Sequence, residues 1–261
     1  MNRLTDTLDN LKKENKKALV AYLVAGDPNL ETTIELMHLL VKSGVDVIEI
    51  GVPFTDPIAE GPIIQKAHDR ALKNNVSLSL IFEMIDQFRK NDNKTPLVLM
   101  GYLNTFIFNK NLIEANKNDF VDSILVVDIP GELKLKDYGV YSTNINTISL
   151  ISPTTKKNRI KSIAKNSTGF VYYVTLRGVT GASNLDVVEI KNNVQEIKKY
   201  ASVPTLAGFG IKSAEDAKLL SKYSDGVIIG SSIVKMIEES SESKEFGRIE
   251  EYITDIKMAI S

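Results

Sequence analysis

Short apolar runs recur along the whole chain, and charged segments of helical length separate most of them. The runs are continuous rather than alternating, which is typical of parallel strands that are covered on both faces. Eight strands are therefore predicted, at Leu19–Val24, Val45–Ile50, Leu97–Met100, Ser123–Val127, Thr147–Leu150, Gly169–Thr175, Val203–Leu206 and Gly226–Ile229.

Between these runs, apolar residues return with the 3.6-residue period of a helix. Two helix starts carry polar caps: Asp27 stands before Pro28, and Ser213 is followed three residues later by Asp216. The helices are predicted at Thr33–Lys42, Leu78–Lys90, Asp186–Tyr200, Ala214–Tyr223 and Phe246–Ile260.

Eight strand–helix alternations in 261 residues predict an α/β fold, a single (β/α)8 TIM barrel that spans residues 1–261. A doubly wound open sheet is the main alternative. No G-x-G-x-x-G pattern follows the first strand, which argues against the dinucleotide-binding form of that alternative.

The first 17 residues add an element before the barrel. Leu4, Leu8 and Leu11 fall at helical spacing, so an extra N-terminal helix over residues 1–17 is expected to pack on the barrel. Charges run through this segment, which excludes a signal peptide, and no apolar run is long enough to span a membrane. A cytoplasmic protein without membrane association is expected.

Composition narrows the chemistry. The chain has 32 Lys and Arg against 33 Asp and Glu, a net charge of −1, which argues against nucleic-acid binding through bulk positive charge. It has no cysteine, which excludes disulfides and thiolate sites. His38 and His68 lie in helical segments away from the strand ends, so we assign them no chemistry and expect no metal site.

In a TIM barrel the chemistry lies at the carboxyl ends of the strands. Glu49 stands near such an end with apolar neighbours, where burial would raise its pKa toward that of a general acid or base. The alternative is an ion pair between Glu49 and a cation of a neighbouring strand. The next loop, Val52–Pro62, contains three prolines and carries Asp56 and Glu60. Asp56 is slightly favoured as a turn or helix cap.

Glycine-bearing segments follow the sixth, seventh and eighth strands, where backbone N–H groups can approach an anion closely. They predict a phosphate site and a small phosphorylated metabolite as substrate. Four aromatic residues also lie near strand ends and could enclose a flat apolar ligand, although each alone more often packs in a core. The segments are Gly178–Gly181, Gly208–Ile211 and Gly230–Ser232, and the aromatic residues are Tyr22, Tyr102, Tyr172 and Phe209.

The segment Ile48–Pro57, followed by Gly61–Gln65, resembles the signature of the tryptophan synthase alpha chain family. Further similar segments follow in the family's order from residue 25 to residue 235, so the resemblance covers nearly the whole chain. They are Ala25–Pro28, Met100 with Tyr102 and Asn104, Val127–Pro130, Pro153–Thr155, Gly178–Gly181, Gly208–Ile211 and Gly226–Lys235.

The resemblance implies a lyase of tryptophan biosynthesis. The family cleaves indole-3-glycerol phosphate to indole and glyceraldehyde 3-phosphate in a retro-aldol reaction and passes indole to a beta chain. It implies no cofactor in this chain, pyridoxal phosphate in the beta chain, and an alpha2-beta2 tetramer.

Residue by residue, Glu49 matches the family's catalytic glutamate, which protonates the indole ring carbon and takes the proton of the adjacent glycerol hydroxyl. Glu60 matches the catalytic aspartate that stabilises charge at the indole N–H. Here the family's Ala-Asp-Gly has become Ala59-Glu60-Gly61. The resemblance implies substrate contacts at Tyr22, Tyr102, Tyr172, Thr180, Gly181, Phe209, Gly210, Ile211, Gly230 and Ser231, with Thr180 and Gly181 in a loop that closes over the substrate.

Other functions stay open, and the longer side chain of Glu60 is the reason for the first of them. One is a weakly active regulatory subunit of the alpha type, which binds the phosphate ligand and activates the beta chain. Others are a stand-alone lyase that releases free indole, or a different phosphate-binding barrel enzyme.

Overall fold

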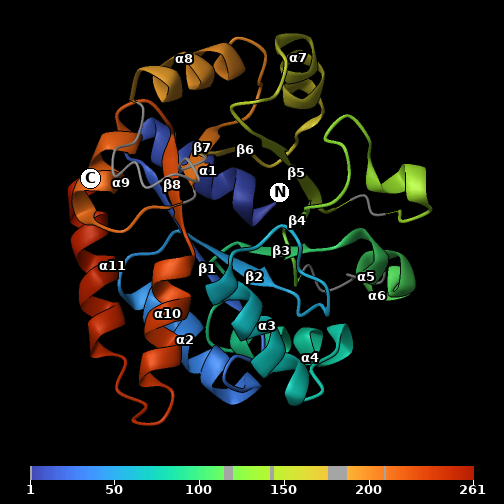
Figure 1. Cartoon of the computed structure of the whole chain (residues 1–261), viewed down its shortest axis with the longest axis vertical. Helices are drawn as coiled ribbons and strands as arrows, with labels where there is room; N and C mark the ends of the chain where they lie inside the picture. The colour runs from blue at the N-terminus through green and yellow to red at the C-terminus, as the bar shows by residue number, and fades with distance from the viewer. Residues whose placement is uncertain (1, 115–119, 142–143, 176–186, 209) are drawn as a thin grey trace.

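Eight parallel strands close into a barrel in which each strand pairs with the next and β8 pairs back with β1 (Figure 1). The computed structural model describes residues 2–114, 120–141, 144–175, 187–208 and 210–261. This closure confirms the predicted TIM barrel and rules out the open sheet. The strands are β1 (Ala18–Val24), β2 (Val47–Gly51), β3 (Leu97–Gly101), β4 (Ser123–Val126), β5 (Asn146–Ile151), β6 (Val171–Val174), β7 (Thr205–Gly208) and β8 (Gly226–Ile229).

Helices surround the barrel and cover the outer face of the strands (Figure 1). The described helices are α1 (Arg3–Lys13), α2 (Leu30–Lys42), α3 (Pro62–Lys73), α4 (Leu78–Arg89), α5 (Leu103–Phe108), α6 (Lys110–Glu114), the 3₁₀ helix η1 (Leu135–Tyr138), α7 (Lys157–Asn166), α8 (Val187–Lys198), α9 (Ala214–Ser221), α10 (Ser231–Ser240) and α11 (Gly247–Ile260).

The seventh strand begins two residues later than its apolar run predicts. Pro204 has no N–H to donate, so it cannot take a donor's place in the ladder. Its carbonyl still accepts a hydrogen bond from the N–H of Val171 at 2.9 Å, and the strand then runs from Thr205 to Gly208. The shift carries the strand's end to the glycine segment expected to bind an anion.

The predicted helix start at Asp27 and Pro28 is wrong. Helix α2 begins at Leu30, and its cap is Asn29, whose side-chain oxygen accepts a hydrogen bond from the N–H of Thr32 at 2.9 Å. Asp27 is buried and binds the guanidinium of Arg70 through two hydrogen bonds of 2.7 and 2.8 Å. A bidentate arginine is a stronger partner for a buried carboxylate than a helix N–H.

The predicted cap at Ser213 is confirmed, since its hydroxyl accepts a hydrogen bond from the N–H of Asp216 at 3.2 Å. The Asp216 carboxylate accepts from the N–H of Lys212 at 2.9 Å.

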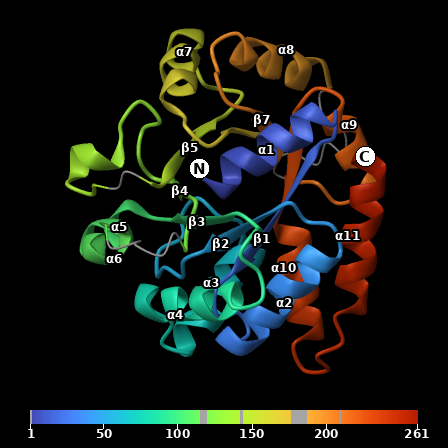
Figure 2. The same cartoon turned by 180° about the vertical axis from the view of Figure 1, so that it is seen from behind.

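The barrel interior is filled by alternate residues of the strands, as a period of two requires. The extra N-terminal helix packs across the amino ends of the strands (Figure 2) and adds Leu4 and Leu8 to this layer. Both leucines are buried, so α1 closes this end of the barrel. The other residues of the layer include Val20, Val47, Val98, Leu125, Ile148, Leu206 and Ile228 of the strands, and Phe170 directly before β6.

None of the helices in the described part of the chain combines the length and apolar character needed to cross a bilayer.

Candidate active site

The side chains directly above the apolar interior layer belong to Tyr22, Glu49 and Tyr172. Each stands two residues after an interior residue, namely Val20, Val47 or Phe170, so it also points into the barrel. Tyr22 and Glu49 are register partners on β1 and β2 and lie at the same level. The three side chains line a cavity of about 280 Å³ at the carboxyl ends of the strands. The alternation of side chains along each strand that fills the barrel interior thus also directs Tyr22, Glu49 and Tyr172 into the cavity.

Glu49 is 1% exposed, and its Oε1 atom has no hydrogen-bond partner among the described residues. No lysine or arginine in the described ranges pairs with it, which argues against the ion-pair alternative. Burial, with a smaller contribution from the negative charge of Glu60, raises the pKa of Glu49 to about 8. At this pKa the carboxyl of Glu49 is mostly protonated at neutral pH. It lines a cavity and has no ion-pair partner among the described residues.

Glu60 reaches the same cavity from the loop between β2 and α3. The Tyr102 hydroxyl donates a hydrogen bond to its carboxylate and accepts one from the N–H of Ala59 at 3.0 Å. Burial raises the pKa of Glu60, and the hydrogen bond from Tyr102 acts in the opposite direction. Tyr102 therefore fixes the longer carboxylate at the cavity wall.

Three further contacts hold this loop. The ring of Phe54 stacks on that of Tyr102, with centroids 4.6 Å apart, and the N–H of Phe54 donates to Nδ1 of His68 at 3.0 Å. The side-chain amide of Gln65 donates to the carbonyl of Glu60 at 2.9 Å. The proline-rich loop is thus bound to both β3 and α3, so the Glu60 backbone is held as well as its side chain.

The other wall of the cavity is formed by Gly210, Ile211, Gly230 and Ser231. Ser231 is the first residue of α10, where unpaired N–H groups and the helix dipole favour an anion. The hydroxyl of Ser232 donates to the carbonyl of Ile211 at 3.1 Å and joins the two segments. Gly210, Gly230 and Ser231, three of the residues expected to bind phosphate, therefore line the same cavity as the two carboxyl groups.

The structure brings together most of the site residues inferred from the sequence. Tyr102 is not among the described residues that line the cavity, and its hydroxyl instead donates a hydrogen bond to Glu60. Asp56 is exposed, and its carboxylate accepts a hydrogen bond from the Thr55 hydroxyl at 2.7 Å. The expected site residues Thr180, Gly181 and Phe209 lie outside the described residues.

Sequence reasoning missed His68. It was assigned no chemistry because it lies within a helix, yet its ring bonds the loop of Glu60 and lies 3.5 Å from the Tyr22 hydroxyl. The helical pattern of α3 places His68 on its buried face, which is the available signal. Ile64 and Met100, which supply apolar cavity wall, stand within segments that carry the family resemblance but were given no role.

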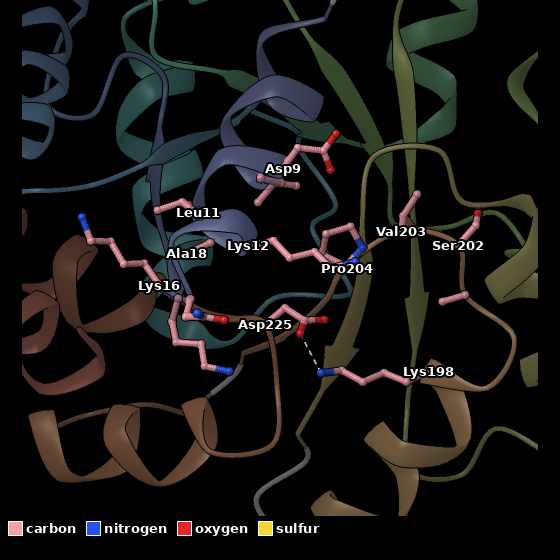
Figure 3. Close-up of a pocket in the computed structure, with 14 residues that line it drawn as sticks. Asp9, Leu11, Lys12, Lys16, Ala18, Lys198, Ser202, Val203, Pro204 and Asp225 are labelled. Carbon is pink, nitrogen blue, oxygen red and sulfur yellow. Dashed lines mark hydrogen bonds and ion pairs between the residues drawn. The ribbon is translucent and has the colours of Figure 1, made fainter.

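A larger cavity, of about 390 Å³, lies at the amino ends of the strands beside α1 (Figure 3). The ammonium group of Lys198 pairs with Asp225 at 2.7 Å, that of Lys16 with Glu14 at 2.8 Å, and that of Lys17 donates to the carbonyl of Ser224 at 2.8 Å. Three of the four lysines around this cavity therefore already have an oxygen partner. The cavity also lies at the amino ends of the strands, whereas the active sites of TIM barrels lie at the carboxyl ends. The lysines are Lys12, Lys16, Lys17 and Lys198.

Comparison with known proteins identifies the family. A family model described as "Tryptophan synthase alpha chain" matches residues 8–260. The chain belongs to the tryptophan synthase alpha chain family. The alpha chain of Thiobacillus denitrificans is 41% identical over 263 residues, and the match covers 100% of this chain and 96% of that relative. The alpha chain of Nitrosomonas europaea is 41% identical over 264 residues, with the same coverage.

Solved structures agree. The tryptophan synthase alpha subunit of Legionella pneumophila superimposes with a TM-score of 0.88 at 36% identity, covering 100% of this chain and 98% of that chain. A chain from the tryptophan synthase a2b2 complex of Pyrococcus furiosus gives a TM-score of 0.82 at 33% identity, covering 92% and 98%.

Members of the tryptophan synthase alpha chain family are lyases of tryptophan biosynthesis that cleave indole-3-glycerol phosphate. The alpha chain of the family holds no cofactor, and pyridoxal phosphate belongs to the beta chain. This family assignment confirms the resemblance read from the sequence, including its reaction class.

Proposed function

We propose that this chain cleaves indole-3-glycerol phosphate with Glu49 as the proton donor and acceptor and Glu60 as the partner of the indole nitrogen. The observation that supports it most strongly is the buried carboxyl of Glu49, whose Oε1 atom has no hydrogen-bond partner among the described residues and whose pKa is raised by burial, beside the Glu60 carboxylate in the same cavity. A group with a pKa near the working pH can both give and take a proton.

In the proposed reaction, Glu49 gives its proton to the indole ring carbon that carries the glycerol side chain. The Glu49 carboxylate then takes the proton of the adjacent glycerol hydroxyl. The carbon–carbon bond breaks, its electrons return to the ring, and the hydroxyl carbon becomes the aldehyde of glyceraldehyde 3-phosphate. Glu49 ends in its starting form, so the step needs no further reactant.

Glu60 supports the charged intermediate. Protonation of the ring carbon places positive charge on the indole nitrogen, and a carboxylate that accepts its N–H hydrogen bond stabilises that charge. Tyr102 keeps the Glu60 carboxylate at the cavity wall, so the extra methylene is accommodated by a fixed hydrogen bond.

The substrate's phosphate is assigned to Gly210, Gly230 and Ser231 at the N-terminus of α10, with Gly181 as a further contact from the sequence. Tyr22, Tyr172, Phe209 and Ile211 are assigned to the substrate's ring and chain, and Thr180 to the closing loop. These roles extend the family's site to this chain residue by residue.

We also propose a beta chain as the partner, in an alpha2-beta2 tetramer that passes indole to a pyridoxal phosphate site. The Pyrococcus furiosus structure that resembles this chain is described as an a2b2 complex. Two large apolar side chains are exposed near the active-site end, Ile58 in the loop before α3 by 84% and Phe108 at the end of α5 by 80%. We further propose that the chain is cytoplasmic and that residues 1–261 form one domain.

The test incubates the full chain with indole-3-glycerol phosphate and measures indole and glyceraldehyde 3-phosphate, with and without a tryptophan synthase beta chain. Cleavage that rises strongly with the beta chain is expected. No product in either condition would refute the lyase, and leave the regulatory subunit as the better account. Full rate without a partner would favour the stand-alone enzyme.

The variant Glu49→Gln should bind the substrate but not turn it over, because an amide cannot exchange the proton. Glu35→Gln, on the exposed side of α2, is the matched control and should keep full activity.

A further inference from the structure

His68 lies next to the active-site cavity and contacts both the loop that carries Glu60 and the side chain of Tyr22. Its Nδ1 atom accepts a hydrogen bond from the N–H of Phe54 at 3.0 Å, and its Nε2 atom lies 3.5 Å from the Tyr22 hydroxyl. We propose that His68 is a positioning residue that ties the loop of Glu60 to Tyr22 and directs the Tyr22 proton into the cavity toward Glu49. This inference rests on the proposed function, because Tyr22 and Glu49 belong to that site.

The tautomer of His68 follows from its contacts. A backbone N–H can only donate, so Nδ1 must carry a lone pair and the ring proton stands on Nε2. His68 is 1% exposed, and burial lowers its pKa to about 4, so the ring stays neutral at neutral pH. The ring therefore donates from Nε2, and the Tyr22 oxygen, 3.5 Å away, is the acceptor that the structure places beside it.

The Tyr22 oxygen then accepts from His68 and must give its own proton elsewhere. Among the described residues it has no other hydrogen-bond partner. The oxygen lies directly over Gly51, where an added Cβ would come within 2.2 Å of it, so the ring has little room to turn away. The open direction is the cavity that Tyr22 lines together with Glu49.

We assign this proton to Glu49 rather than to Glu60, which also lines the cavity but already accepts a hydrogen bond from Tyr102. Tyr22 and Glu49 are register partners on neighbouring parallel strands, so their side chains leave the sheet on the same side. Oε1 of Glu49 is buried and lacks a partner among the described residues. A hydroxyl aimed at this carboxyl stabilises the carboxylate that forms when Glu49 gives its proton to the substrate. His68 thus acts on the reaction through Tyr22.

The first test is a double-mutant cycle in the chain bound to its beta chain. His68→Asn keeps an acceptor near Nδ1 for Phe54 but has nothing at Nε2, and Tyr22→Phe removes the hydroxyl. Each change should lower kcat roughly five- to tenfold, the effect of one hydrogen bond. In the Tyr22→Phe background, His68→Asn should lower kcat by less than about twofold more, because the contact it removes is already gone.

The matched control is His38→Asn. His38 packs its ring against Phe88 in the outer helix layer, with centroids 4.7 Å apart, and lies outside the active site. It should leave kcat unchanged in both backgrounds. If His68→Asn lowers kcat equally with and without the Tyr22 hydroxyl, His68 does not act through Tyr22 and the proposal is overturned.

The second test does not depend on activity. The chain has only two histidines, so ¹⁵N-histidine NMR gives a simple spectrum, and the His38→Asn variant assigns it. We expect His68 as the neutral Nε2–H tautomer from pH 5.5 to 8, and its shifts should change on Tyr22→Phe. An Nδ1–H tautomer, or a ring that titrates near pH 6.5, would overturn the proposal. If the wild-type chain cleaved no substrate, the proposed function would fail while this spectrum still decided the state of His68.

Discussion

The carboxyl of Glu49 derives its chemistry from its surroundings rather than from its identity. In water a glutamate is ionised at neutral pH, but Glu49 is buried, the described residues that line its cavity include no lysine or arginine, and the Glu60 carboxylate lies nearby. The charged form is therefore disfavoured, and the free chain holds the proton that the first step needs. A buried acid without a partner lowers the stability of the fold. Such groups are therefore found mainly where a function requires them.

The raised pKa of Glu49 predicts the pH dependence of catalysis. Below about pH 8 the group is protonated and can donate, and above it the donor is lost. We expect kcat/KM for indole-3-glycerol phosphate to fall about tenfold for each pH unit above 8. The substrate phosphate is already fully ionised there, since its second pKa is about 6. Steady-state rates from pH 6.5 to 10 measure this, and a flat profile to pH 9.5 would contradict it.

The length of the side chain at position 60 gives a second residue-level prediction. Tyr102 is held by its stacking on Phe54 and donates to the Glu60 carboxylate, so a shorter side chain loses that contact. We expect Glu60→Asp to lower kcat about 10- to 100-fold, the cost of a displacement of about 1 Å.

The control for this prediction is Tyr102→Phe, which removes the same hydrogen bond at full side-chain length. It should lower kcat less than Glu60→Asp does, and the double variant should resemble Glu60→Asp alone. A rate gain in Glu60→Asp would show instead that the longer side chain impairs the enzyme.

Among the elements, α10 carries the anion end of the site. Its first residue, Ser231, lines the cavity beside Gly210 and Gly230. Ser231→Asp places a negative charge where the substrate phosphate is expected. KM should rise about 10- to 100-fold while kcat changes little, because the repulsion acts on the phosphate and not on the reacting ring.

Ser241→Asp, at the opposite end of the same helix, is the matched control and should leave KM unchanged. A similar rise in KM for both variants would mean that overall charge, and not the position of Ser231, is responsible. Steady-state kinetics at fixed ionic strength separates the two results.

The helices and strands also show which structural features can be predicted from the sequence. Eight continuous apolar runs predicted the eight strands, because burial on both faces leaves a clear pattern. The start of α2 was missed because Asp27 is bound by Arg70, 43 residues further on, which no local rule detects. His68 was missed for the same reason. Its helical position indicates burial, but only the folded barrel brings its ring to Phe54 and Tyr22.

At the residue level, the sequence predicted Glu49 from its apolar neighbours and the position of Glu60 from its stiff loop. It could not show that Tyr102 donates a hydrogen bond to Glu60 rather than lining the cavity, since that depends on which way the ring turns at the end of β3. Placement by strand position is therefore predictable, while the hydrogen bonds that tune each group depend on packing between distant segments.

In the whole molecule, the residues that stabilise the barrel and the residues of the candidate active site lie at opposite ends of the barrel axis. The amino ends of the strands are closed by α1 and an apolar layer, and the carboxyl ends carry the cavity. Glu49 and Tyr22 stand on that layer, since each follows an interior valine of its own strand by two residues. The layer thus fixes the floor of the site while remaining out of contact with solvent.

This division predicts that the closure by α1 can be weakened without harming the reaction. Leu4 is fully buried in the interior layer, so Leu4→Ala leaves a cavity and should lower the free energy of unfolding by about 2–5 kcal/mol. Urea denaturation measures the loss, and kcat at 25 °C should stay within about twofold, because the substituted residue lies at the far end of the barrel. Met258→Ala, at a side chain 66% exposed, is the control and should cost less than about 0.5 kcal/mol. A large drop in kcat for a Leu4→Ala chain that is still folded would show that the floor of the site depends on α1, and that the two ends of the barrel are coupled.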